Sequence, residues 1–244
     1  MTDKLNLKFL KCQQREHFIS MMTLIKRSNN KKFIIYCNGK KVVDFFVDIL
    51  DYLKIESTSE YDDYMKEKSK ICFIDKSFSL DINEIIADYL IFFDLPQLQV
   101  IDNILNLSSS FVSNISVIFL VRECEKDWTE SNLVGKLKAK EITIPRSHLI
   151  DIEAPMKVGT KKLFALQRDA QLAYKSFIND YATNCVGNIS DLKLKEIANN
   201  FGLDIPPKIN DFENLLNQTS KPESGSSIVN QTVAEVPRKL RKIR

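Results

Sequence analysis

Residue types that commonly perform chemistry are sparse and scattered in this chain of 244 residues. The two histidines, His17 and His148, have no cysteine or carboxylate at catalytic or ligand spacing. The five cysteines lie at least 25 residues apart, so no pair has metal-ligand spacing, and we expect reduced, buried thiols. The sequence therefore predicts no catalytic residue and no metal site.

The glycines are too dispersed to form a phosphate-binding loop. A Walker A or G-x-G-x-x-G turn needs clustered glycines, because only then do several backbone N–H groups approach a phosphate closely. The six glycines here are Gly39, Gly135, Gly159, Gly187, Gly202 and Gly225. We therefore expect no bound cofactor, and ATP only if a partner chain supplies a P-loop domain.

The composition is that of a globular protein, with 44% hydrophobic and 27% charged residues. The length suits one domain with an appendage. A net charge of +3 does not by itself indicate a nucleic-acid partner. No apolar run reaches the roughly 18 residues of a membrane span, and no secretory signal is recognised, so we expect an intracellular protein without a membrane partner.

Short apolar runs alternate with stretches of helical periodicity along the chain. Strands are predicted at about residues 32–37, 71–74, 89–93 and 116–121. Helices are predicted at about residues 17–28, 40–53, 60–68, 97–107, 129–140, 160–185 and 191–200. Continuous apolar strands that alternate with helices are typical of a parallel sheet covered on both faces.

Two segments near the C-terminal end carry a resemblance to a known family. Residues 170–182 read AQLAYKSFINDYA, and residues 201–209 read FGLDIPPKI. They resemble the helical extension that follows the second RecA-like domain in DEAD-box RNA helicases of the ribosome-assembly group. The family pattern is roughly A-x-x-A-Y/F-x-S-Y/F-I/V-x-A-Y, then a short acidic helix, then F/L-G-L/F-x-x-P/A-P-K/R.

The resemblance covers about residues 5–210 and implies an α/β fold, a RecA-like parallel sheet with helices on both faces, followed by a small helical extension. It divides the chain into a degenerate second RecA-like domain (1–140), the extension (141–212) and a disordered basic tail (213–244). An apolar stripe should pack the extension against the sheet. Its members are Leu163, Leu166, Ala170, Ala173, Tyr174, Phe177, Ile178 and Tyr181.

Two helicase motifs survive in part. The segment Phe33–Gly39 falls where the family has motif IV, so the resemblance implies that Asn38, Gly39 and Lys40 contact RNA phosphates. An ordinary strand and turn is the alternative. Asp75 and Asp81 match the two aspartates of motif V, so the resemblance implies that they are vestigial nucleotide-binding residues. The motif V threonine that touches RNA is replaced by Ile74, and the Arg-Gly pair is missing.

The groups that support ATP hydrolysis in the family have no counterpart in this sequence. Residues 100–110, where motif VI should lie, contain no histidine, arginine or glycine. An arginine acting on the γ-phosphoryl group is worth about 10³–10⁵ in rate. The P-loop domain is also absent from the sequence. We therefore expect the chain alone to be inactive as an ATPase.

The tail holds five basic residues within its last seven positions: Arg238, Lys239, Arg241, Lys242 and Arg244. They are predicted to contact RNA phosphates in a salt-dependent way. A solvated terminus or a nuclear-targeting patch is the alternative.

The function that these observations favour is that of a catalytically degenerate DEAD-box ATP-dependent RNA helicase-like protein. It would bind pre-ribosomal RNA or ribosome-assembly proteins in rRNA processing, in the nucleus or nucleolus. One alternative is the second half of a split helicase that needs a separate ATP-binding chain. Another is an α/β protein–protein adaptor with no RNA role. The sequence does not indicate an oligomeric state.

Overall fold

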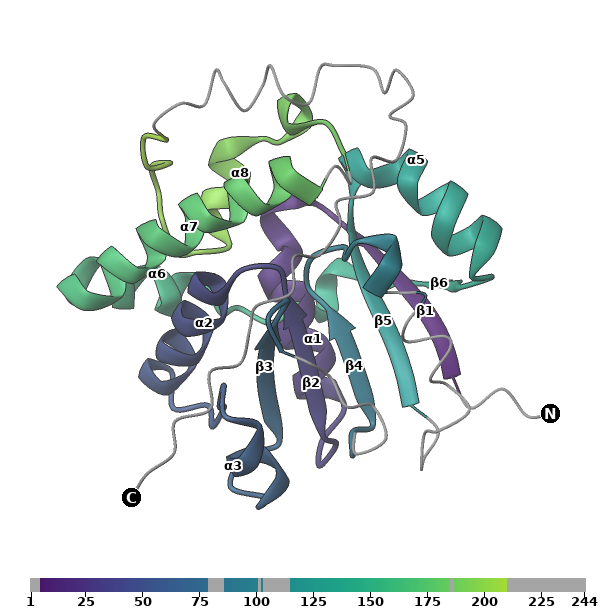
Figure 1. Cartoon of the computed structure of the whole chain (residues 1–244). Coiled ribbons are helices and arrows are strands. Elements are labelled where there is room, and N and C mark those ends of the chain that lie inside the picture. Colours follow the sequence, from purple (N-terminus) through teal and green to yellow (C-terminus); the bar gives the residue numbers. More distant parts are fainter. Residues whose placement is uncertain (1–4, 79–85, 101, 103–114, 185–186, 210–244) are drawn as a thin grey trace, which may run out of the picture.

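The computed structural model describes residues 5–78, 86–100, 102, 115–184 and 187–209. Six strands form one parallel sheet in the order β3-β2-β4-β5-β1-β6 (Figure 1). The strands are β1 (Leu5–Cys12), β2 (Phe33–Cys37), β3 (Ile71–Asp75), β4 (Tyr89–Phe92), β5 (Ile115–Arg122) and β6 (Lys140–Ile142). The predicted fold class, a parallel α/β sheet followed by helices, is confirmed.

Helices lie on both faces of this sheet. They are α1 (His17–Arg27), α2 (Lys40–Tyr52), α3 (Tyr61–Met65), α5 (Lys126–Trp128), a π-helix (Thr129–Lys136), α6 (Glu153–Lys162), α7 (Phe164–Asn184) and α8 (Leu194–Asn199). One core contains side chains of α1, α2, α6, α7 and α8, and the core on the other face contains side chains of α3 and the π-helix. Across the described ranges, no helix is both long and apolar enough to cross a bilayer.

Strand β2 explains why an unbroken apolar run predicts a central strand. Successive side chains of a strand point to opposite faces. Phe33 and Ile35 therefore enter the core with α1 and α2, whereas Ile34 and Tyr36 enter the core with α3. Because both faces are covered, every position of this strand must be apolar.

Strand β1 was not predicted. Its sequence, LNLKFLKC, mixes polar and apolar residues, with Asn6 and Lys11 exposed and Phe9 and Leu10 buried. It pairs with β5 along its whole length but with the short β6 over only three residues. A strand so near the edge of the sheet is covered incompletely, so it lacks the continuous apolar run that marks the central strands.

The helix predicted over 160–185 is two helices. The backbone of Leu163 is extended (φ −109°, ψ 112°), which ends α6 and lets α7 begin in a new direction. Leu163 is 45% exposed, so its assignment to the buried stripe was wrong. The other seven predicted stripe residues are buried, and the packing of this helix against the sheet domain is confirmed.

The aromatic ring of Phe201 joins the C-terminal helices to α2. It stacks on Phe46 at 5.9 Å between ring centroids and contacts Phe45, Tyr174 and Phe177 at 5.9–6.1 Å. The turn after α8 that presents this ring uses Gly202 at φ +67°, a backbone conformation that favours glycine. These helices therefore share one apolar core with the sheet.

His17 and Cys12 form a buried pair that the sequence spacing did not suggest. The Nε2 atom of His17 lies 2.8 Å from the Phe93 carbonyl oxygen, so it carries the proton and donates. The Nδ1 atom, 3.0 Å from Cys12 Sγ, then accepts from the thiol. Burial raises the pKa of the Cys12 thiol to about 12. The thiol is therefore protonated at neutral pH, and the pair is structural rather than nucleophilic.

Replacing His17 should change how stability depends on pH. Burial, and secondarily Arg122, holds the pKa of His17 well below its usual value, so the folded protein keeps it neutral. The unfolded chain protonates it near pH 6.5, so its stabilising contribution is present above that pH and is lost as the pH falls. Between pH 7.5 and 5.5 this loss amounts to about 1.4 kcal/mol.

The measurement is urea denaturation of the wild type and of His17→Gln at both pH values. Glutamine can donate to the Phe93 carbonyl but does not titrate. The loss of stability on acidification should be smaller in the variant by about 1.4 kcal/mol. An equal loss in both proteins would mean that His17 is protonated in the folded state.

Candidate functional site

Polar residues lie at the carboxyl ends of the strands, which meet along one end of the parallel sheet. In open α/β sheets this edge is where ligands bind. We call it the carboxyl edge and define it by Asn38–Lys40 after β2, Asp75–Ser77 at β3, Asp94 after β4 and Arg122 at the end of β5. Helix α7 lies across these strand ends beside α2 (Figure 1).

Arg122 is the centre of a buried ion cluster at this edge. Only 1% of its side chain is exposed. Its Nη2 atom lies 3.1 Å from Asp94 Oδ1, and its Nη1 atom lies 3.0 Å from Glu125 Oε1. The guanidinium carbon also sits 4.6 Å from the ring centroid of Phe177, a residue of α7. The cluster thus connects two strand ends with the helix that covers them.

Burial sets the electrostatics of the cluster. It raises the pKa of Asp94 and of Glu125, and the nearby positive charge of Arg122 opposes that rise without cancelling it. Burial alone would lower the pKa of Arg122, but Glu125 and Asp94 outweigh it and raise that pKa. The guanidinium therefore stays charged, and it is the group that holds both carboxylates in the interior.

The ion cluster also fixes the turn between β2 and α2. The second oxygen of Asp94 accepts a hydrogen bond from the Asn38 backbone N–H at 3.1 Å. The side-chain amide of Asn38 donates to the Leu95 carbonyl at 3.3 Å. Asn38 is only 6% exposed, so this predicted RNA-binding residue is committed to the turn.

Gly39 is required for the close approach of α7 to this turn. A Cβ atom at this position would lie 2.5 Å from Asp180 Oδ2 and 2.6 Å from Ser176 Oγ. Gly39 is therefore buried, and of the three predicted phosphate contacts in this turn only Lys40 is exposed. The prediction that this turn contacts RNA remains a prediction, with Lys40 as its accessible group.

The remaining predicted site residues fall into two groups. Asp75 is 7% exposed, and its carboxylate accepts hydrogen bonds from the backbone N–H and the hydroxyl of Ser77, so it shapes the turn after β3. The others lie outside the described residues: Asp81, Arg238, Lys239, Arg241, Lys242 and Arg244.

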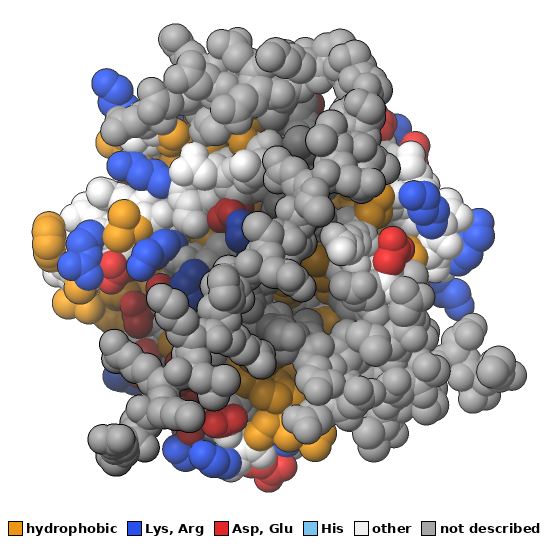
Figure 2. Space-filling view, viewed as in Figure 1, with side chains coloured by type: hydrophobic (Ala, Val, Ile, Leu, Met, Phe, Trp, Pro, Cys, Tyr) orange, Lys and Arg blue, Asp and Glu red, His pale blue; other side chains and the backbone are white. Residues whose placement is uncertain are grey.

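The exposed lysines at the carboxyl edge are paired with aspartates. Lys40 and Lys41 both contact Asp44, at 2.9 and 3.6 Å, and Lys76 contacts Asp180 at 2.6 Å. Figure 2 shows acidic and basic side chains interspersed over the coloured parts of the face in view. Nucleic-acid sites usually carry a continuous basic patch instead. The described part of this edge is therefore close to internally neutral.

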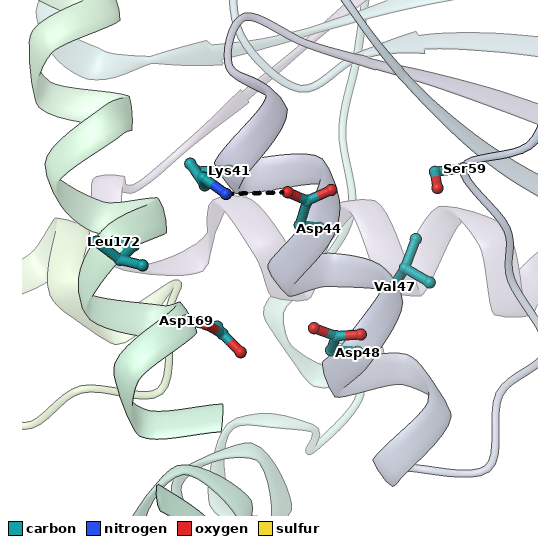
Figure 3. Close-up of a pocket in the computed structure, with 7 residues that line it drawn as sticks. All are labelled: Lys41, Asp44, Val47, Asp48, Ser59, Asp169 and Leu172. Atoms are coloured by element: carbon teal, nitrogen blue, oxygen red, sulfur yellow. Dashed lines mark ion pairs between the residues drawn. The ribbon is translucent and has the colours of Figure 1, made fainter. Parts of the chain in front are cut away.

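A groove of about 310 Å³ separates α2 from α7 (Figure 3). It is lined by Lys41, Asp44, Val47, Asp48, Ser59, Asp169 and Leu172. Asp48 and Asp169 face each other across it, and burial together with Asp169 raises the pKa of Asp48. Three aspartates and one lysine line this groove, so its charge disfavours a phosphate group. Among the described residues, no group of three or more histidines, cysteines or carboxylates could hold a metal ion.

The sequence did not reveal Arg122, Glu125 or Asp180 as residues of this edge. The position of two of these residues in the sequence could have indicated a contact, because Asp94 and Arg122 each stand directly after an apolar run. Residues at the carboxyl ends of parallel strands meet in space, so these two were candidates for a contact.

Comparison with known proteins supports the resemblance. No protein-family model matches the chain. The ATP-dependent RNA helicase HAS1 of Scheffersomyces stipitis is 21% identical over 227 residues, which cover 85% of this chain and 40% of the relative. Human ATP-dependent RNA helicase DDX18 is 20% identical over 224 residues, which cover 84% of this chain and 33% of the relative.

Solved structures agree on the fold. The structure described as Mss116p DEAD-box helicase domain 2 bound to an RNA duplex superposes with a TM-score of 0.58, at 13% identity, covering 82% of this chain and 88% of that chain. DEAD-box helicase Mss116 bound to ssRNA and UDP-BeF gives a TM-score of 0.62, at 14% identity, covering 90% of this chain and 49% of that chain.

The resemblance to DEAD-box RNA helicases is thereby confirmed, and the fold is that of their second RecA-like domain. This chain spans about 40% or less of the length of the two helicase relatives described above.

Removing the cation of the buried cluster should destabilise the fold severely. Arg122→Ala leaves Asp94 and Glu125 buried without a compensating positive charge, which costs about 3–5 kcal/mol. Lys11→Ala breaks the exposed Lys11–Glu141 pair between β1 and β6 and should cost at most about 1 kcal/mol. Urea denaturation at pH 7.5 measures both variants.

A triple variant tests whether the cost arises from the unpaired carboxylates. Arg122→Met combined with Asp94→Asn and Glu125→Gln removes every charge of the cluster and should recover part of the stability lost in Arg122→Ala. If Arg122→Ala and Lys11→Ala destabilised the protein equally, the buried cluster would not be the anchor of this edge.

Proposed function

We propose that this chain acts as a DEAD-box RNA helicase-like binding module that does not itself hydrolyse ATP. Its partners would be pre-ribosomal RNA or ribosome-assembly proteins, and its place would be the nucleus or nucleolus. The observation that carries this proposal is the second RecA-like fold in a chain whose residues 100–110, where motif VI should lie, contain no histidine, arginine or glycine. A scaffold that keeps its fold and loses its catalytic groups is best suited to binding.

The RNA contacts in this proposal are electrostatic. Lys40 and Lys41 are each 58% exposed and share one partner, Asp44, so a phosphate oxygen has to displace only exposed ion pairs. Exposed pairs of this kind are worth about 0–1 kcal/mol, which a phosphate contact can offset. The basic segment that ends in Arg244 would add affinity without sequence preference.

Two measurements on the purified chain test the proposal. RNA-stimulated ATP hydrolysis should stay far below the usual enzymatic range of about 1 s⁻¹. The chain should bind single-stranded RNA in a salt-dependent manner, and Lys40→Ala/Lys41→Ala should weaken that binding. Lys11→Ala, which removes an exposed lysine of β1, a strand separated from β2 by β4 and β5, is the control and should bind as the wild type does.

Deletion of residues 237–244 separates the contribution of the basic segment to RNA binding from that of Lys40 and Lys41. Each phosphate contact contributes about 0.7 to the log–log salt slope on single strands, so the deletion should flatten the slope. An unchanged slope would exclude RNA contact by this segment and favour a targeting role. ATP turnover on addition of a separate P-loop domain would favour the split-helicase alternative, and absence of RNA binding by the full chain would favour the adaptor.

A further inference from the structure

The carboxylate of Asp180, a residue of α7, lies against the start of α2 at the carboxyl edge. Asp180 Oδ1 lies 2.6 Å from Lys76 Nζ, and Oδ2 accepts a hydrogen bond from Ser176 Oγ at 3.1 Å. The same Oδ2 is the atom that a Cβ at Gly39 would meet. Gly39 is the N-cap of α2, so this side chain, which is only 15% exposed, covers the first turn of that helix.

The start of α2 is a favourable place for an anion. The first backbone N–H groups of a helix have no partners within the helix, and together with the helix dipole they attract negative charge. The N-cap of this 13-residue helix makes no side-chain capping hydrogen bond, and its first turn contains no acidic residue. Lys40, Lys41 and Lys76 add positive charge around the same turn.

We propose that Asp180 is an autoinhibitory group that takes the place of an RNA phosphate at the start of α2. This inference rests on the proposed RNA-binding function and concerns how that binding is limited. An RNA phosphate brought to this turn would meet the Asp180 carboxylate, and Lys76 would have to leave Asp180 to reach the phosphate. The contact therefore lowers RNA affinity for as long as α7 stays in place.

At the position of Asp180, the sequence of α7 differs from the helicase pattern. The helicase pattern quoted for this segment ends in Ala-Tyr, whereas the chain has Asp180-Tyr181. An alanine cannot pair with Lys76 or present charge to α2. The negative charge over the turn is not required for packing α7, because buried side chains such as Tyr181 and Phe177 supply that packing.

Asp180→Asn tests the inference with little change in shape. Asparagine can still accept from Ser176 but carries no charge, and Lys76 is left free. Single-stranded RNA should bind about two- to tenfold more tightly at low salt, with a salt slope steeper by about 0.7 for one added phosphate contact. Lys76→Ala in the Asp180→Asn background should abolish this gain, because Lys76 supplies the new contact.

Asp204→Asn is the matched control. Asp204 also belongs to the C-terminal part of the chain and pairs with Lys161 at 2.6 Å, but its partners lie on α6 rather than at the carboxyl edge. Its replacement changes the net charge by the same amount and should alter RNA affinity much less. Urea denaturation of both variants confirms that each is folded under the binding conditions.

The outcomes separate this inference from the proposed function. If the wild type binds RNA and Asp180→Asn binds with the same affinity and salt slope, the autoinhibitory role is overturned while the RNA-binding function stands. Equal tightening by Asp180→Asn and Asp204→Asn would also overturn it, because net charge would then be the cause. If neither the wild type nor Asp180→Asn binds RNA, both proposals fail.

Discussion

The guanidinium of Arg122 lies in the protein interior, where a charge without partners would be too costly to keep. One oxygen of Asp94 accepts a hydrogen bond from the guanidinium, and the other accepts one from the Asn38 backbone N–H in the turn after β2. Phe177 covers the guanidinium from α7, so the helix is fixed above the same strand ends. The position of the extension and the shape of the carboxyl edge thus follow from how one buried charge is accommodated.

The position of α7 limits which residues of the carboxyl edge a ligand can reach. With α7 fixed over it, Gly39 and Asn38 are covered, and the accessible cations are Lys40, Lys41 and Lys76. Lys40 and Lys41 share Asp44 of α2, and Lys76 pairs with Asp180 of α7, so a polyanion must compete with internal partners. The affinity of this edge for a polyanion therefore depends on whether those ion pairs open.

The sequence predicted the parts of the fold that depend on local pattern and missed those that depend on long-range pairing. The central strands appeared as apolar runs because both of their faces are buried, whereas β1, near the edge of the sheet, did not. The break at Leu163 has no proline or glycine to signal it.

The ion cluster joins Asp94 to Arg122 across 28 residues, and Asp180 meets Lys76 across 104 residues. Periodicity within one element carries no information about such contacts, so Lys40 was identified but its surroundings were not.

Native-state hydrogen exchange tests most directly whether the buried cluster holds α7 and the sheet together as one unit. The amides of α7 around Phe177 and those of β2 around Ile35 should show the same free energy of opening, equal to that of global unfolding, because neither can open without exposing Arg122. In Arg122→Ala, any difference between the two sets should grow as α7 loses its anchor. Wild-type α7 amides that exchange several kcal/mol more easily than those of β2 would contradict the account, since the extension would then detach while the sheet stays folded.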